Sequence, residues 1–169
     1  NKEADIVISA GNTGALLVIS KLNLKMIENI DKPALSALWP NKKGMSVVLD
    51  LGANIECNSK NLVDFSIMGA SLYKSLYPNN TPKIALLNIG SEELKGNEII
   101  KETFQILNEK KFKNFDFSGY IEGNQLMDGN VNVIISDGFT GNVALKTAEG
   151  TANFITDELK KVFKGSILG

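Results

Sequence analysis

Five short apolar runs along the chain have the length and composition of β-strands. Most of them are rich in valine, isoleucine and leucine without regular polar alternation, which is typical of strands covered on both faces. The runs are residues 4–9, 46–51, 83–89, 115–122 and 131–136. We therefore expect five strands, most of them buried in one sheet.

Between these runs, apolar residues recur at intervals of three and four, which places them on one face of an α-helix. Three helices are predicted in this way, from Leu62, Phe65, Met68, Leu72 and Leu76; from Ile99, Ile100, Thr103, Phe104 and Leu107; and from Ala148, Ala152, Ile155, Leu159 and Val162. Segment 31–43, with Pro33 and Pro40, is predicted to be an irregular connection. This alternation favours an α/β fold with a mainly parallel sheet and flanking helices, and we expect residues 1–169 to form a single domain.

Four loops rich in glycine and asparagine follow predicted strands, at residues 9–15, 50–54, 88–97 and 136–142. Ligands of open parallel sheets bind outside the carboxyl ends of the strands, so we expect these loops to meet at one edge. A helix that begins after such a loop offers N–H groups and a positive dipole end to an anion. One such loop is more typical of an ordinary turn, but four favour a shared anion site. No loop matches a nucleotide-binding fingerprint, and we expect no cofactor.

The loops supply the candidate site residues. Lys95 is the candidate for stabilising negative charge, with a solvated loop lysine as the equal alternative. Asn97 is expected to orient the Lys95 loop, and Asn142 to hold phosphate or an oxyanion together with Asn12. The other candidates for phosphate and substrate binding are Gly11, Thr13, Gly14, Asn54, Gly138, Thr140 and Gly141. Lys146, within the last predicted helix, is expected to be exposed.

Composition narrows the chemistry further. The net charge of −1 provides no basic field to attract nucleic acid, and the chain has no histidine, which excludes Ser-His-Asp and Cys-His arrangements within it. It also has no arginine, so an anion would be held by lysine and backbone N–H groups. The nearby carboxylates more readily cap helices or pair with lysine than bind metal, and no metal site is expected; they are Asp50, Glu56, Glu92, Glu93, Glu122 and Asp137.

Cys57 is the only cysteine, which fits a reducing cytoplasm, and we expect a small buried side chain rather than a nucleophile. No signal-peptide pattern and no apolar run of transmembrane length is present in the sequence. We therefore expect a cytoplasmic protein. The chain enters a predicted strand almost at once and ends just after a charged helix, so we expect an internal fragment of a longer enzyme.

Six stretches resemble the phosphate acyltransferase family of bacterial phospholipid synthesis, in the family's order. They are SAGNTGA (9–15), PALSALWP (33–40), LDLGANIEC (49–57), LLNIGSEELKGNE (86–98), GYIEGNQL (119–126) and SDGFTGNVALKTAEG (136–150). The resemblance implies a fold like that of phosphotransacetylase and isocitrate or isopropylmalate dehydrogenase, and a homodimer with its active site in a cleft. It also implies transfer of a fatty acyl group from acyl carrier protein to inorganic phosphate, which gives an acyl phosphate that a membrane acyltransferase then consumes.

The chemistry implied by the resemblance agrees with the composition. Phosphate is already an oxygen nucleophile and a thiolate is a good leaving group, so the reaction needs positioning and oxyanion stabilisation more than a strong base. Two alternatives remain: a phosphotransacetylase-type enzyme that uses acyl-coenzyme A, and a non-catalytic module that binds acyl carrier protein or an anion. A decarboxylating dehydrogenase is more remote, because it would need arginines for its substrate carboxylate.

The last predicted helix mixes apolar residues with lysines. For residues 151–163 we favour a plain amphipathic helix that packs on the sheet or on a dimer partner. Near Lys164, the lysines clustered at the helix end and the apolar Ile167 and Leu168 that follow favour contact with an anionic membrane surface. A peripheral position at the inner face of the membrane is therefore expected for the region near the end of this helix.

Overall fold

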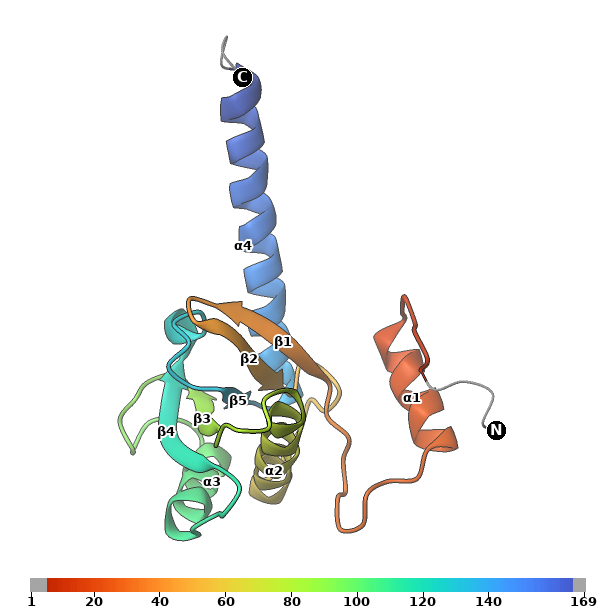
Figure 1. Ribbon diagram of the computed structural model, residues 1–169, viewed down its shortest axis with the longest axis vertical. Helices are drawn as coiled ribbons and strands as arrows, with labels where there is room; N and C mark the ends of the chain where they lie inside the picture. Colours follow the sequence, from red (N-terminus) through yellow and green to blue (C-terminus); the bar gives the residue numbers. More distant parts are fainter. Residues whose placement is uncertain (1–5, 166–169) are drawn as a thin grey trace. The chain divides into compact units, whose positions relative to one another are not determined.

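The computed structural model describes residues 6–165, and the chain divides into two compact units, Asn1–Pro33 and Ala34–Gly169. Figure 1 shows the helices and strands coloured along the sequence. In the first unit, α1 (Thr13–Asn23) begins after Asn12, whose side-chain Oδ1 accepts hydrogen bonds from the N–H groups of Gly14 and Ala15 at 2.8 and 3.3 Å. Asn12 is therefore the N-cap of this helix.

The strand predicted at residues 4–9 is wrong for the part that the structure describes. Residues 6–9 have no regular secondary structure, and Ile6, Val7 and Ile8 are 78%, 82% and 92% exposed. Residues 4 and 5 lie outside the described residues. A strand is stabilised by hydrogen bonds to a neighbouring strand, and none of the strands within 6–165 pairs with this run.

The second unit contains a five-stranded sheet in the order β1-β2-β5-β3-β4. Its strands are β1 (Ser36–Asn41), β2 (Gly44–Leu49), β3 (Lys83–Asn88), β4 (Asp116–Glu122) and β5 (Val133–Ile135). The first two strands are antiparallel, and the pairs β2·β5, β5·β3 and β3·β4 are parallel. The predicted mainly parallel α/β fold is confirmed.

The prediction of an irregular connection at residues 31–43 is wrong, because this segment contains β1. The strand lies at the edge of the sheet, where Pro40 is paired with Met45 of β2. Proline removes a ladder donor and is tolerated mainly in edge strands. The prolines therefore indicated a break where the chain forms the edge of the sheet.

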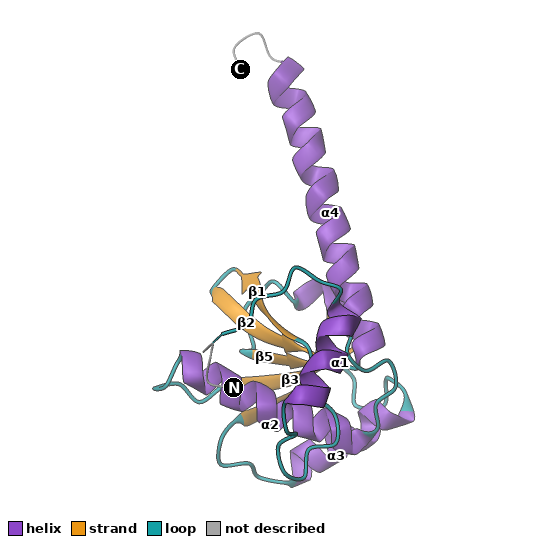
Figure 2. Ribbon diagram, turned by 90° about the vertical axis from the view of Figure 1, so that its right-hand side faces the viewer, coloured by secondary structure: helices purple, strands orange, loops and turns teal. Residues whose placement is uncertain are grey.

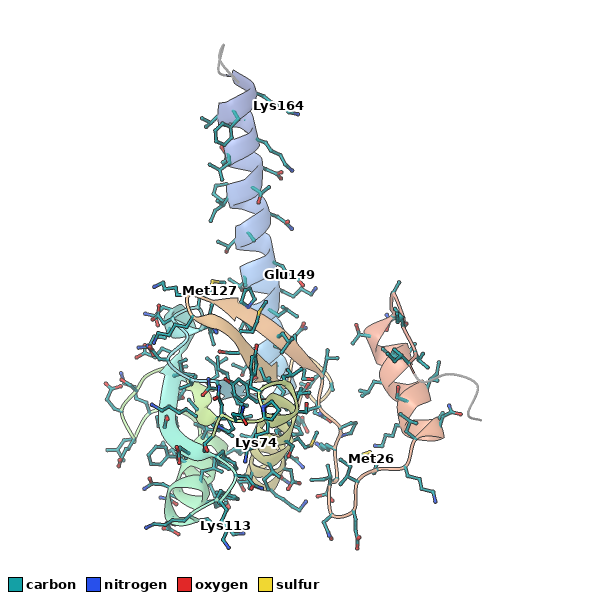
Figure 3. The ribbon with its side chains drawn as sticks, in the orientation of Figure 1. Met26, Lys74, Lys113, Met127, Glu149 and Lys164 are labelled. Carbon is teal, nitrogen blue, oxygen red and sulfur yellow. The ribbon has the colours of Figure 1, made fainter. Side chains whose placement is uncertain are left out.

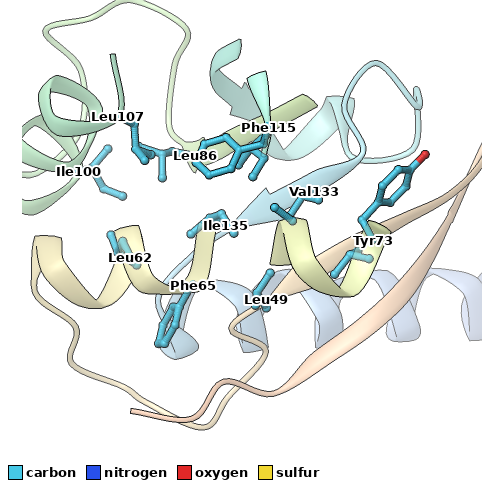
Figure 4. Packing of buried hydrophobic residues seen from close by; sticks show 13 residues of the cluster. Leu49, Leu62, Phe65, Tyr73, Leu86, Ile100, Leu107, Phe115, Val133 and Ile135 are labelled. Carbon is cyan, nitrogen blue, oxygen red and sulfur yellow. The ribbon is translucent and has the colours of Figure 1, made fainter. Parts of the chain in front are cut away.

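Helices cover both faces of the sheet (Figure 2). On one face, α2 (Ser59–Leu76) and α3 (Glu98–Glu109) pack against a cluster that includes Leu49, Leu86 and Ile135, as Figure 4 shows. The other face carries a second cluster around Trp39, Val48, Ala85 and Ile134, against which the start of α4 (Gly138–Gly165) packs. Neighbouring residues of each buried strand thus face opposite clusters, which explains their unbroken apolar character.

The predicted helices are confirmed, and two of them are longer than their apolar spacing indicates. The helix α2 starts at Ser59 with a capping box between Asn58 and Asn61, and α4 starts at Gly138, ten residues before Ala148. Beyond Glu149, α4 extends away from the sheet with its side chains exposed, as far as Lys164 (Figure 3). No helix within residues 6–165 is both long and apolar enough to cross a membrane.

Candidate functional site

Three of the four glycine-bearing loops meet at one edge of the second unit. They follow β2, β3 and β5, which lie next to one another in the sheet with parallel direction, so their carboxyl ends coincide. Two adjoining hollows of about 480 and 550 Å³ lie between them. Both hollows are lined by Asn97, Ile100, Asp137 and Thr140, and we call them together the loop cleft.

The buried carboxylate of Asp50 organises the first loop. Its Oδ1 accepts hydrogen bonds from the backbone N–H groups of Leu35 (2.9 Å), Gly52 (3.2 Å) and Ala53 (3.0 Å). Its Oδ2 accepts from the backbone N–H and the side-chain amide of Asn54, at 2.8 and 2.7 Å. Asp50 is 0% exposed, so these bonds offset the cost of burying its charge. Its role is therefore to shape the loop, and the Asn54 amide takes part in that role.

Two glycines allow the start of α4 to approach this loop closely. The Gly138 N–H donates to the Asn54 carbonyl oxygen at 2.8 Å, and a Cβ at Gly138 would lie 2.6 Å from that same oxygen. A Cβ at Gly141 would overlap the Asp50 carbonyl oxygen and lie 2.6 Å from Ser136 Oγ. These predicted binding residues thus bring the helix N-terminus to the cleft by close packing.

Three polar side chains lie at the start of α4, and two of them, Asp137 and Thr140, line the loop cleft. Asp137 caps the helix, because its Oδ1 accepts from the Thr140 N–H and its Oδ2 from the Thr140 hydroxyl, both at 2.8 Å. Asn142 is exposed and lies beside Gly52, where a Cβ would be 3.5 Å from the Asn142 side chain. With φ of +132°, Gly52 occupies a conformation that favours glycine.

The loop after β3 is closed by Asn88, a residue that sequence reasoning gave no role. Its Nδ2 donates to the carbonyl oxygens of Gly90 and Lys95, at 3.1 and 3.0 Å. Gly96, at φ +99°, lies against the Asn88 side chain. Asn97 caps α3, with its Oδ1 accepting from the Ile100 N–H at 2.9 Å. An asparagine at a strand end before a long loop was the available signal for Asn88.

Lys95 is exposed and paired with Glu92, with 2.9 Å between Nζ and Oε1. The hydrogen bond and charge of Glu92, with a contribution from Glu122, raise the pKa of Lys95 above its ordinary 10.5. The same hydrogen bond lowers the pKa of Glu92 below its ordinary 4.5. The pair is lost as the pH falls through the lowered Glu92 pKa or rises through the raised Lys95 pKa, so it persists through the neutral range.

Lys95 is not among the residues that line the loop cleft within the described chain. Its side chain lies over Gly90, where a Cβ would be 3.2 Å from Nζ. Reaching an anion in the cleft therefore requires the Lys95 side chain to leave Glu92. Lys146 is exposed as predicted and pairs with Glu149 at 2.7 Å.

Cys57 is half-buried at the cleft wall, and its thiol donates weakly to the Asn54 carbonyl oxygen at 3.6 Å. The fourth loop, with Gly11, Asn12, Thr13 and Gly14, belongs to the first unit, and Asn12 there caps α1. No group of three or more Cys, Asp or Glu residues in the described part of the chain could hold a metal ion.

An α/β sheet whose carboxyl edge carries a cleft with polar residues and a helix N-terminus is typical of enzymes that bind anionic substrates. The family model described as "Fatty acid synthesis protein" matches residues 1–169, and the chain belongs to this family. This confirms the resemblance indicated by the six motifs.

Curated relatives named phosphate acyltransferase match almost the whole chain. The protein of Pelagibacter ubique (strain HTCC1062) is 79% identical over 168 residues, which cover 99% of this chain and 50% of the relative. The protein of Caulobacter vibrioides is 49% identical over 158 residues, which cover 94% of this chain and 44% of the relative. The protein of Rhizobium leguminosarum bv. trifolii is 45% identical over 166 residues, which cover 98% of this chain and 48% of the relative. The chain thus spans about half the length of the curated relatives it matches.

Proposed function

We propose that this chain is part of a phosphate acyltransferase that moves a fatty acyl group from acyl carrier protein to inorganic phosphate. The observation that carries the proposal is the family match over the whole chain, together with the name phosphate acyltransferase that the relatives bear. The chain spans about half the length of these relatives, which supports a part of a longer enzyme. That it is an internal fragment and forms one α/β domain stays a prediction from the sequence. The products would be an acyl phosphate and free acyl carrier protein.

The reaction would proceed by direct attack. A phosphate oxygen bonds to the thioester carbonyl carbon, the carbonyl oxygen becomes an oxyanion, and the carbon–sulfur bond then breaks. The thiolate leaves with the electron pair and takes up the proton that phosphate brought. No redox partner or separate base is required, which suits a chain without histidine.

The loop cleft would hold the reacting groups. Asn97 and Thr140 line both of its hollows, and Asn142, in the first turn of α4, lies beside Gly52. We propose that Asn142 donates to phosphate or the oxyanion and that Lys95 swings from Glu92 to the developing charge. Asn97 would place the Lys95 loop through its cap on α3. Phosphate binding by Gly11, Asn12, Thr13 and Gly14, which belong to the first unit, stays a prediction from the loop pattern of the sequence.

The test is phosphate-dependent thiol release by the full-length protein, with thioesters of acyl carrier protein and of coenzyme A compared. We expect release only with phosphate present, faster with the carrier-protein thioester. Preference for coenzyme A would indicate the phosphotransacetylase-type alternative. Binding of acyl carrier protein without any release would indicate a non-catalytic module. Release that does not depend on phosphate would contradict the proposal.

We further propose a homodimer that touches the inner face of the cytoplasmic membrane, where a membrane acyltransferase takes up the acyl phosphate. The supporting observation is the exposed part of α4, where Phe154, Ile155, Leu159, Val162 and Phe163 are each more than half exposed. Apolar surface of this kind usually marks an interaction site. Lysines lie on the same helix, at positions 160, 161 and 164.

The lysines near the end of α4 should strengthen binding to anionic vesicles. Lys160 pairs with Asp157 at 3.4 Å and Lys161 with Glu158 at 2.6 Å, but exposed pairs of this kind are weak and leave the lysines able to meet anionic lipid. The triple Lys160→Glu, Lys161→Glu, Lys164→Glu variant should sediment with vesicles less than wild type, and the difference should shrink at higher salt.

A matched control makes the same charge change elsewhere. Lys110, Lys111 and Lys113 follow α3 and are exposed, so replacing them with glutamate alters the net charge equally without touching α4. This control should bind vesicles like wild type. Equal binding by wild type and the α4 variant, at low and at moderate salt, would mean that these lysines do not contact lipid.

A further inference from the structure

A third hollow, of about 550 Å³, lies between α4 and the sheet face that carries Trp39. Its wall on the sheet side is formed by Trp39 of β1 together with Leu126 and Met127, and its other wall by Ala148 and Ile155 of α4. We call it the α4 groove. Its lining is mostly apolar, in contrast to the more polar hollow at Ile55–Cys57 in the loop cleft.

The α4 groove continues from the loop cleft. Gly123 and Ala144 line both the groove and the larger hollow of the cleft. From Ala144, the groove follows α4 past Ala148 and Ala152. These alanines are spaced by four, so they share one face of the helix and advance about 6 Å with each step. Small side chains on this face keep the groove open.

We propose that the α4 groove binds the fatty acyl chain of the thioester, with the reacting carbonyl carbon held in the loop cleft. The inference rests on the proposed function and assigns the chain-binding site within it. A substrate with a polar reacting end and a long apolar tail needs a polar hollow that leads into an apolar one. The polar hollow at Ile55–Cys57 adjoins the larger, more apolar hollow of the cleft through Asn97 and Thr140, and that hollow adjoins the α4 groove through Gly123 and Ala144. The volume is within the usual range of small-molecule sites.

Chain length should then be selected by the alanines of α4. In the full-length protein, Ala148→Phe fills the groove one helical step from the cleft and should lower kcat/KM for palmitoyl-carrier protein by at least about tenfold. The same variant should leave kcat/KM for butyryl-carrier protein within about twofold, because the short chain ends before the obstruction. Ala152→Leu adds less bulk one step further on, and should affect palmitoyl transfer while sparing octanoyl transfer.

The matched control is Asn153→Phe, which adds the same ring to an exposed position on another side of α4. This control should change kcat/KM neither for long acyl chains nor for short ones. An equal change with long and short chains in the Ala148→Phe and Ala152→Leu variants, or no change, would overturn the inference. A changed oligomeric state with unaltered chain-length dependence would also overturn it, and would indicate that a second copy covers the groove.

A binding readout separates this inference from the proposed function. Trp39 is the only tryptophan of the chain and lines the groove. A palmitoyl chain that carries bromine near its methyl end should quench Trp39 fluorescence when its thioester binds, and Ala148→Phe should abolish the quenching. Quenching without formation of acyl phosphate would keep the groove and reject the proposed reaction. Formation of acyl phosphate without quenching would support the proposed reaction and reject the α4 groove as the chain-binding site.

Discussion

Replacing Lys95 with alanine should lower kcat for acyl phosphate formation by roughly 10²–10³, the usual effect of removing one donor to a developing oxyanion. Lys95 lies on the loop closed by Asn88, and its Nζ is held by Glu92 at 2.9 Å on the surface. An exposed ion pair costs little to break, so the lysine can turn toward the cleft when phosphate or the oxyanion forms there. The measurement is kcat and KM for the full-length protein.

The control for this substitution is Glu92→Gln, which removes the same ion pair and keeps the lysine. If Lys95 acts only by holding its loop together with Glu92, both variants should lose activity equally. If Lys95 acts by its charge, Glu92→Gln should remain within a few-fold of wild type. A folded Lys95→Ala protein within twofold of wild type would remove the residue from the mechanism.

Replacing Gly141 with alanine should destabilise the protein by about 3 kcal/mol or more, because the added Cβ would overlap the Asp50 carbonyl oxygen. That oxygen belongs to backbone that is buried and hydrogen-bonded to Ser136, so neither side can yield easily. The helix start would be pushed away from loop 50–54, and the loop cleft would lose its wall. The melting temperature should fall by roughly 6–12 °C for a protein of this size.

Gly150→Ala is the matched control, since it lies on the same helix and nothing is within 4 Å of the added Cβ. It should be neutral or more stable by about 0.5–1 kcal/mol, because glycine in a helix interior is unfavourable relative to alanine. Similar melting temperatures for Gly141→Ala and wild type would contradict the close approach of α4 to Asp50.

Most of the sheet and the helices were predictable because their patterns reflect burial. The strands β2, β3 and β5 lie between two layers of helices, which requires the unbroken apolar runs at 46–51, 83–89 and 131–136. The same reasoning failed at residues 6–9, because an apolar run indicates burial without specifying what covers it. It failed again at β1, because proline excludes a central strand but is accepted at an edge.

The positions of the site loops were predictable from the sequence, but the roles of their side chains were less so. Loop positions follow from the strand order, and three of the four predicted loops meet at the cleft. The roles of individual polar groups depend on packing: Asn12 and Asn97 both appear as helix caps, and the Asn54 amide is bound to Asp50. Nothing in the residue pattern distinguishes a capping asparagine from one that meets a ligand, since both follow a strand and precede a helix.

Phosphate labelled with heavy oxygen shows whether phosphate itself attacks the thioester. Full-length protein is incubated with palmitoyl-acyl carrier protein and the labelled phosphate, and the acyl product is analysed by mass spectrometry before and after trapping with hydroxylamine. We expect an acyl phosphate that carries the full label and is converted to the hydroxamate. Free fatty acid with oxygen from water, formed at the same rate without phosphate, would contradict it.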